Sequence, residues 1–287
     1  MSDDRTRAML DTNADQAAYY DATDGGTVAA INGRMTNLWR VLRHRLISAV
    51  PHEVREGLYD IHKDWIGDPA GKKVLELGCG SGSALSEHLA DHAGEYHAID
   101  LSEDQIRQLR ERLGAREGLH LHVADVLSDE FAETEFDLIY AQSIFHHFRF
   151  IEVLFDRVET LLAPGGRVIT LDPVQAWWPA RIVRGVFRPF QTDADWEFPF
   201  TARTLRQIET RFRVEASRGL FNRSKWALVL GLVAPERATR LGTAWFRQDL
   251  SHDPTWRDRR ASLQISYMLS LAREGDGDQT QAQKSKE

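Results

Sequence analysis

The most constraining feature of the sequence is a short apolar run that leads into three closely spaced glycines. The segment VLELGCGSGSAL (74–85) has the pattern of a strand, a glycine-rich turn and the first turn of a helix. Glycine permits a tight turn and lets a ligand approach the backbone at the carboxyl end of the strand. Dinucleotide-binding proteins use a similar turn, but their third glycine normally falls one position later, where this chain has Ser83.

Four further strand-like runs follow, separated by segments of helical length. They are 96–100, 119–125, 136–140 and 167–172. Strands that alternate with helices form a mostly parallel sheet with helices on both faces. One of the helices is well marked, because Ser102 and Gln105 have capping-box spacing and Gly114 suits the helix end. The pattern therefore predicts an α/β domain.

The alternating region divides the chain into three parts. Residues 1–65 are expected to form an N-terminal helical lid region. Residues 66–273 are expected to form the core of the fold. The polar tail at 274–287 has the composition of a disordered segment.

The core is expected to carry two insertions that elaborate an acceptor site. The first, at about 173–200, has an irregular pattern, and the second, at about 222–256, favours helix. A helix capped by Thr201 and a closing strand within 263–273 are predicted around them.

The composition argues against several classes of function. A net charge of −7 over 287 residues disfavours a broad nucleic-acid-binding surface. Cys79 is the one cysteine, so no internal disulfide can form, which fits a cytoplasmic location. There is no signal-peptide pattern, and the longest apolar stretch, at 226–235, is too short for stable membrane insertion. Composition leaves a homodimer open.

Carboxylates lie where the second and third predicted strands end. Asp100 follows the glycines by about twenty residues, and a carboxylate there can accept hydrogen bonds from both ribose hydroxyls of a nucleoside. Asp125 can accept from an adenine amino group, and Val126 can offer its backbone N–H. The carboxyl ends of parallel strands share one edge of the sheet, where ligands bind in open α/β folds.

With these residues the chain resembles the class I S-adenosylmethionine-dependent methyltransferases, in their small-molecule and ubiquinone/menaquinone branch. The matching motifs, in family order over 74–172, are ELGCGSG, IDLS, ADV, FDLIYAQSIFHHF and LLAPGGRVIT. The resemblance implies a Rossmann-like, mostly parallel seven-stranded sheet with an N-terminal helical lid and C-terminal helical insertions. It also implies S-adenosyl-L-methionine as cofactor, S-adenosyl-L-homocysteine as product and a small-molecule acceptor.

The resemblance implies roles for ten residues around the cofactor. Asp100 would hold the ribose, Leu101 would pack on the adenine, and Asp125 with Val126 would read the adenine edge. Glu76 would act indirectly through the loop, and the glycines would border the methionine portion. The full expected set is Glu76, Gly78, Cys79, Gly80, Gly82, Asp100, Leu101, Asp125, Val126 and Gln142.

Two adjacent histidines follow the fourth predicted strand. Histidine suits proton transfer at neutral pH, so His147, or else His146, is a candidate general base. The alternative is a pocket wall that hydrogen-bonds to cofactor or acceptor. Neighbouring residues on one segment rarely both reach one ion, so no metal site is predicted.

Aromatic side chains are the candidates for acceptor binding. The resemblance to a family lid element in AAYYD implies that one of two tyrosines closes over the site, although a core aromatic pair is an alternative. The segment 177–200 holds seven aromatics, against 9% across the chain, and packing against the sheet or a dimer partner is its alternative role. The expected acceptor-binding residues are Tyr19, Tyr20, His147, Trp177, Trp178 and Trp196.

The leading hypothesis is methyl transfer to a small, partly apolar or aromatic molecule, in specialised metabolism. A second hypothesis keeps the fold but makes the acceptor a quinone or isoprenoid lipid that is methylated at carbon. Two hypotheses of other classes are a nicotinamide-dependent oxidoreductase and a catalytically silent cofactor-binding protein.

Overall fold

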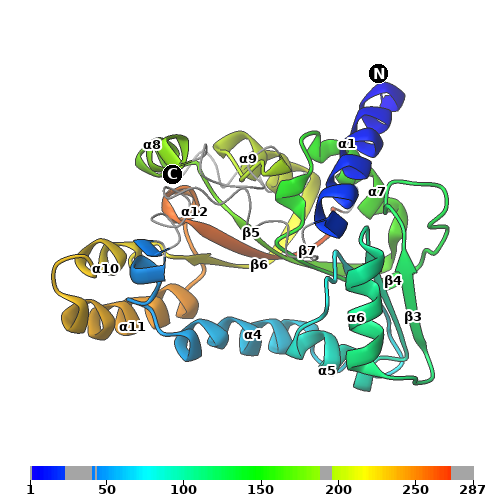
Figure 1. The fold of residues 1–287 in the computed structure, drawn as a ribbon, viewed down its shortest axis with the longest axis horizontal. Helices are drawn as coiled ribbons and strands as arrows, with labels where there is room; N and C mark the ends of the chain where they lie inside the picture. Colours follow the sequence, from blue (N-terminus) through cyan, green and yellow to red (C-terminus); the bar gives the residue numbers. More distant parts are fainter. Residues whose placement is uncertain (1, 23–40, 43, 188–195, 273–287) are drawn as a thin grey trace.

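The fold is built around one seven-stranded sheet (Figure 1). The computed structural model describes residues 2–22, 41–42, 44–187 and 196–272. The strand order is β3-β2-β1-β4-β5-β7-β6, and β7 runs antiparallel to both of its neighbours while the other pairs are parallel. The strands are β1 (Lys73–Leu77), β2 (Glu95–Asp100), β3 (Leu119–Val123), β4 (Phe136–Gln142), β5 (Leu162–Pro173), β6 (Phe212–Leu220) and β7 (Gln264–Leu271). The predicted mostly parallel α/β sheet is confirmed.

Helices cover both faces of the sheet. Successive residues of a strand point to opposite faces, so on β1 Val74 packs into one apolar cluster and Leu75 into the other. The described helices are α1 (Ser2–Ala22), α4 (His52–Ile66), α5 (Ala84–His92), α6 (Glu103–Leu113), η2 (Phe145–His147), α7 (Ile151–Leu161), α8 (Trp178–Phe187), α9 (Ala202–Arg211), α10 (Lys225–Leu230), α11 (Pro235–Ser251) and α12 (Trp256–Ala261). The face with α4, α5 and α6 lies below the sheet in Figure 1, and the face with α1, α7 and α9 lies above it.

The local sequence explains where helix α6 begins and ends. The Ser102 side chain accepts from the Gln105 N–H at 3.3 Å, at the first turn of α6. Ile106 and Leu109 are buried against the sheet, and Gly114 ends the helix with a φ of 68°.

The first insertion differs from the expectation. Residues 173–200 were expected to be irregular, but 178–187 form α8, so the prediction is wrong for that part. Pro179 stands in the first turn of α8, where proline is tolerated because its missing N–H has no partner to lose. The second insertion is helical as predicted, in α10 and α11.

The N-terminal region contributes to both faces of the sheet. Met9 of α1 lies in the apolar cluster on the face covered by α1, α7 and α9. Arg5 of α1 forms an ion pair with Glu152 of α7. Helix α4 packs on the opposite face of the sheet (Figure 1). Of these two helices of the predicted lid region, α1 is therefore the one on the same face as α7 and α9. The tail at 274–287 lies outside the described residues, as do 23–40.

Candidate cofactor-binding site

A cavity of about 350 Å³ lies beyond the carboxyl ends of β1, β2, β3 and β4. This volume falls within the range of small-molecule sites. The strand ends converge there because parallel strands all finish at the same edge. Seven of the ten expected cofactor residues line the cavity, namely Gly78, Gly80, Asp100, Leu101, Asp125, Val126 and Gln142. Glu76, Cys79 and Gly82 do not.

The glycine-rich turn needs glycine for two separate reasons. Gly78 has a φ of 61°, and a Cβ there would lie 2.0 Å from Ile144 Cδ1. Gly82 has a φ of 84°, and a Cβ there would lie 2.5 Å from Leu109 Cδ1 of α6. Both positions combine a left-handed backbone with close packing, which only glycine allows without strain.

Asp100 braces this turn while it lines the cavity. Its Oδ2 accepts from the Gly80 N–H at 2.8 Å, and its Oδ1 accepts from the Ser102 N–H at 3.0 Å. An ionised carboxylate has about four acceptor positions, so a side chain of this type can accept from backbone N–H groups and from a ligand hydroxyl together.

Glu76 lies beneath the turn, away from the cavity. It accepts from Ser86 Oγ at 3.0 Å and from the Tyr96 hydroxyl. Ser86 also completes a capping box with Ser83, the residue that caps α5. Burial raises the pKa of the Glu76 carboxyl to about 7, an effect that the two hydrogen bonds oppose.

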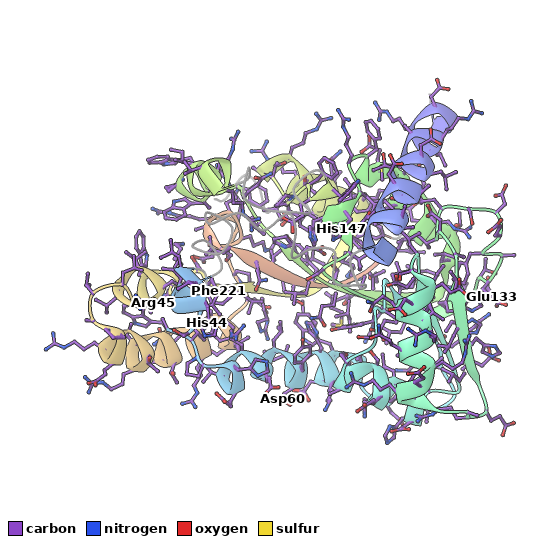
Figure 2. The ribbon with its side chains drawn as sticks, in the orientation of Figure 1. His44, Arg45, Asp60, Glu133, His147 and Phe221 are labelled. Carbon is purple, nitrogen blue, oxygen red and sulfur yellow. The ribbon has the colours of Figure 1, made fainter. Side chains whose placement is uncertain are left out.

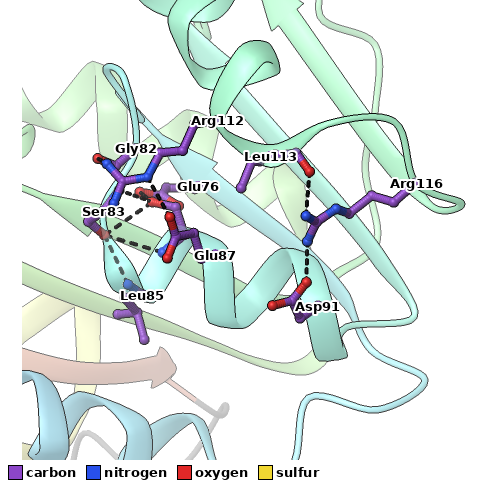
Figure 3. A network of polar contacts seen from close by, with 10 residues as sticks. Glu76, Gly82, Ser83, Leu85, Glu87, Asp91, Arg112, Leu113 and Arg116 are labelled. Atoms are coloured by element: carbon purple, nitrogen blue, oxygen red, sulfur yellow. Dashed lines mark hydrogen bonds and ion pairs between the residues drawn. The ribbon is translucent and has the colours of Figure 1, made fainter.

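Two other groups complete the surroundings of the turn. Arg112 of α6 donates to the Gly82 carbonyl at 2.9 Å and pairs with Glu87 of α5 at 2.7 Å (Figure 3). Burial raises the pKa of the Cys79 thiol above its usual range, so at neutral pH the thiol is protonated and a poor nucleophile.

Helix α1 closes one side of the cavity through two residues that the sequence analysis did not single out. Asn13 Nδ2 donates to Asp125 Oδ2 at 2.8 Å, and the Leu127 N–H donates to Asp125 Oδ1 at 2.8 Å. Gln16 Nε2 lies 3.0 Å from His147 Nδ1. Met9, Asn13 and Gln16 are spaced so that they share one face of the helix. That spacing was the signal in the sequence that could have identified Asn13 and Gln16.

A strained turn after β4 carries His147 to the cavity. Ser143 has a φ of 60°, unusual for a residue with a side chain, and its N–H donates to the Leu171 carbonyl at 2.7 Å. The turn presses Ile144 against Gly78 and places His147, at the end of η2, in the cavity wall. Figure 2 shows His147 beside the end of α1.

His146 occupies a different position from its neighbour. It is buried and does not line the cavity. Its Nδ1 lies 2.9 Å from Asp172 Oδ1, and its backbone N–H donates to the same oxygen at 3.1 Å. Thr170 Oγ1 donates to the other oxygen of Asp172, which is fully buried at the end of β5. The His146–Asp172 pair therefore anchors η2 to β5, a contact that the sequence analysis did not foresee.

The predicted acceptor tryptophans lie outside the cavity. Trp177 contacts the Trp226 ring at a centroid distance of 5.7 Å, and Lys225 Nζ lies 4.7 Å from the Trp177 ring centre. Trp178 is 69% exposed on α8, and Trp196 is partly buried. The backbone of residues 19–20 belongs to α1, but the two tyrosine side chains lie outside the described part. A role for these residues in acceptor binding stays a prediction.

Comparisons with known proteins agree with this geometry. Residues 75–168 match a family model described as a methyltransferase domain. A malonyl-[acyl-carrier protein] O-methyltransferase of Ilyobacter polytropus is 29% identical over 98 residues, which are 33% of this chain and 37% of that protein. A phosphoethanolamine N-methyltransferase of Triticum aestivum is 34% identical over 104 residues, 36% of this chain and 21% of that protein. The chain thus matches well under half of the length of these curated relatives.

A solved structure supports the fold. The geranyl diphosphate C-methyltransferase of Streptomyces coelicolor A3(2) superposes with a TM-score of 0.52 and 14% identity, over 77% of this chain and 80% of that chain. Likeness at this identity concerns the fold alone. The family match over 75–168, the strand–glycine–helix unit and the strand order together support a methyltransferase domain of the class I S-adenosylmethionine-dependent type in this part of the chain.

Proposed function

We propose that this protein transfers a methyl group from S-adenosyl-L-methionine to a small-molecule acceptor. The observation that carries the proposal is the cavity at the carboxyl ends of four parallel strands, lined by the carboxylates of Asp100 and Asp125. Carboxylate oxygens at these two positions suit the ribose hydroxyls and the adenine amino group. The open turn at Gly80, where a Cβ would meet nothing closer than 3.5 Å, leaves room for the cofactor's methionine portion.

Each cavity residue has a defined task in this proposal. Asp100 holds the ribose, Leu101 packs on the adenine, and Asp125 with the Val126 N–H reads its edge. When bound, the cofactor supplies a methyl group on a positively charged sulfur, already activated for displacement. The chain has to align the acceptor and exclude water, and alignment alone is worth an effective molarity of roughly 10⁵–10⁸ M.

His147 serves as a hydrogen-bonding wall in this proposal. An amide N–H can only donate, so the contact from Gln16 Nε2 makes His147 Nδ1 the acceptor and leaves the ring proton on Nε2. To accept a proton at Nδ1, His147 would have to release Gln16. This arrangement supports orientation of cofactor or acceptor in preference to general base catalysis.

Calorimetry with S-adenosyl-L-homocysteine tests the proposed cofactor. Asp100→Asn removes the charge that strengthens the ribose hydrogen bonds, and loss of roughly 1.5–3 kcal/mol weakens binding about tenfold to a hundredfold. Asp129→Asn, at an exposed carboxylate outside the cavity, serves as the matched control and is expected to bind normally. Unchanged affinity in Asp100→Asn would remove the assignment, and binding of NADH in place of the homocysteine would favour an oxidoreductase.

Turnover of His147→Asn tests the role of the histidine. Production of S-adenosyl-L-homocysteine is measured with a panel of phenols, amines and carboxylic acids as acceptors. We expect turnover to fall by less than tenfold with cofactor affinity retained, because a wall residue contributes less than the roughly 10²–10⁴ of a general base. A fall within that larger range would establish the base. No product from any acceptor with wild-type protein would favour the silent cofactor-binding alternative.

A second candidate acceptor is a quinone or isoprenoid lipid, favoured by exposed apolar residues on α8 and α10. Trp177, the residue just before α8, contacts Trp226 of α10. The exposed apolar residues are Trp178, Ile182 and Val186 on α8, Trp226 and Val229 on α10, and Leu232 and Val233 just after it. In the described residues, no helix has the length and apolarity needed to cross a membrane. The proposed contact is with the membrane surface.

Liposome sedimentation and activity on a prenylated phenol test this second candidate. If it holds, wild-type protein sediments with liposomes, and Val233→Ser, at a position 81% exposed, weakens that association. If the protein does not associate with liposomes and is active on water-soluble acceptors, the small-molecule acceptor remains and the lipid acceptor is rejected.

A further inference from the structure

Three side chains with metal-ligating atoms meet where β2 pairs with β3, at the edge of the sheet. Glu95 and His97 are two residues apart on β2, so they share a face of the sheet. The parallel register places His120 of β3 directly beside His97. One ligand atom from each of the three lies within 4.8 Å of the others. The group lies toward the start of β2, whereas the cofactor cavity begins at Asp100, where β2 ends.

His97 presents an unsatisfied nitrogen to this group. The residue is 2% exposed, and its Nδ1 lies 3.1 Å from His122 Nε2. Its Nε2 is buried and makes no hydrogen bond within the described part of the chain. The nearest carboxylate oxygen, Glu95 Oε2, is 3.5 Å away, beyond good hydrogen-bond distance. A buried polar atom left unpaired is costly, so this nitrogen calls for a partner.

We propose that Glu95, His97 and His120 form a binding site for a divalent transition metal ion, with Zn²⁺ the best match. Two imidazoles and one carboxylate are a common zinc donor set, in which water completes four ligands. Magnesium and calcium are disfavoured, because they prefer oxygen ligands. The His97 Nδ1–H donated to His122 would direct the Nε2 lone pair to the ion, as ligating histidines usually do through a second hydrogen bond.

The surroundings of the three residues let a metal ion enter from solvent and offset the nearby positive charge. Glu95 and His120 are exposed, so an ion can reach them from solvent, and rotation of these two side chains brings the ligand atoms to bonding distance. Lys73 lies nearby and opposes a cation, but its ammonium is 2.7 Å from Glu133, which offsets it. Figure 2 shows Glu133 at the side of the molecule away from His147. Bound metal would tie the outermost strand β3 to β2, and so act on stability.

Zinc titration of metal-free, untagged protein tests the site. Binding is measured by competition with a chromophoric chelator at about pH 7.5, where histidines are deprotonated enough to ligate. We expect one strong site in wild-type protein and at least tenfold weaker binding in His120→Asn. His120 is exposed, so the variant should fold, and an unchanged melting temperature without metal checks this.

His88→Asn is the matched control. His88 and His92 of α5 lie with their ring centroids 4.5 Å apart and the rings tilted, at an i, i+4 spacing that suits a surface metal ion. We expect this variant to bind zinc as wild type does. With Co²⁺, wild-type protein should show the visible absorption of a tetrahedral site, and His120→Asn should not. Absence of binding up to about 100 μM zinc, or less than tenfold weakening in His120→Asn, would overturn the proposal.

Discussion

The carboxyl group of Glu76 is a single buried acid whose protonation bears on stability. Its pKa is raised to about 7, against 4.5 for an exposed glutamate, because burial disfavours the charged form. Between these two pH values the folded protein keeps a proton that the unfolded chain has released. The stability contributed by Glu76 is therefore full below about pH 4.5 and is lost as the pH rises through 7.

Glu76→Gln should remove this pH dependence, because glutamine resembles the protonated acid. We expect its free energy of unfolding at pH 8 to exceed that of wild type by up to about 3 kcal/mol, and the two proteins to converge near pH 4.5. Urea denaturation at both pH values measures the difference. Glu130→Gln, at an exposed position in the segment after β3, is the control and should show no such trend. An equal difference at both pH values would contradict the account.

At the scale of elements, α1 joins the cavity through polar contacts and little apolar packing. Of its described side chains, the buried ones are Met9, Asn13 and Gln16. Asn13 donates to the half-buried carboxylate of Asp125, and Gln16 contacts His147. Since the helix buries so little apolar surface, these two hydrogen bonds carry much of its attachment to the core.

Asn13→Ala should loosen α1 in the absence of ligand. Loss of a hydrogen bond to a charged group costs roughly 1.5–3 kcal/mol, so amide exchange within α1 should speed up about tenfold to a hundredfold. Bound S-adenosyl-L-homocysteine should reduce this excess, because its adenine amino group would supply Asp125 with a donor. Hydrogen-exchange mass spectrometry gives the rates, and Thr12→Ala, whose hydroxyl bonds within α1, is the control. Wild-type rates in Asn13→Ala would show that α1 is held by other contacts.

The elements differ in how well the sequence predicts them. The parallel strands and α6 are predictable because their signals, short apolar runs and a capped helix, are local. Helix α8 is not, since Pro179 and Gly185 obscure its pattern. The contacts of Asn13 and Gln16 join residues 112 and 131 positions apart, and no local pattern encodes them. The glycine turn and Asp100 were predictable because they lie close together in the sequence. The glycines join one strand to its helix, and Asp100 ends the next strand.

At the scale of the whole molecule, His62 ties distant parts of the chain together. It lies buried on α4, with Nδ1 3.1 Å from the Tyr140 hydroxyl of β4 and Nε2 2.8 Å from Ser266 Oγ of β7. Tyr140 also donates to Gln142, which lines the cavity and donates in turn to Tyr59. One hydrogen-bonded network therefore spans the N-terminal region, the central strand and the closing strand.

This network should make the fold sensitive to acid. Burial lowers the pKa of His62 to about 3, against 6.5 when exposed, so below pH 6.5 the unfolded chain takes up a proton that the folded protein refuses. The contribution of His62 is full above pH 6.5 and is lost as the pH falls toward 3. Between pH 7 and 5 this loss is about 2 kcal/mol, from 1.36 kcal/mol per pH unit.

His62→Gln should lose less stability on acidification, because glutamine keeps a donor and an acceptor but does not titrate. We expect wild type to lose about 2 kcal/mol more than this variant between pH 7 and pH 5, measured by urea denaturation. At pH 7 the variant should be the less stable protein, since its side chain fits the His62 site less well. His52→Gln, at an exposed position on the same helix, should follow wild type. A loss in His62→Gln as large as that of wild type would mean that acid acts through other groups.

The contribution of Glu76 to stability changes in the opposite direction over this pH range, because it increases as the pH falls. Each variant is therefore compared with wild type at the same pH, and the two effects are separated in this way.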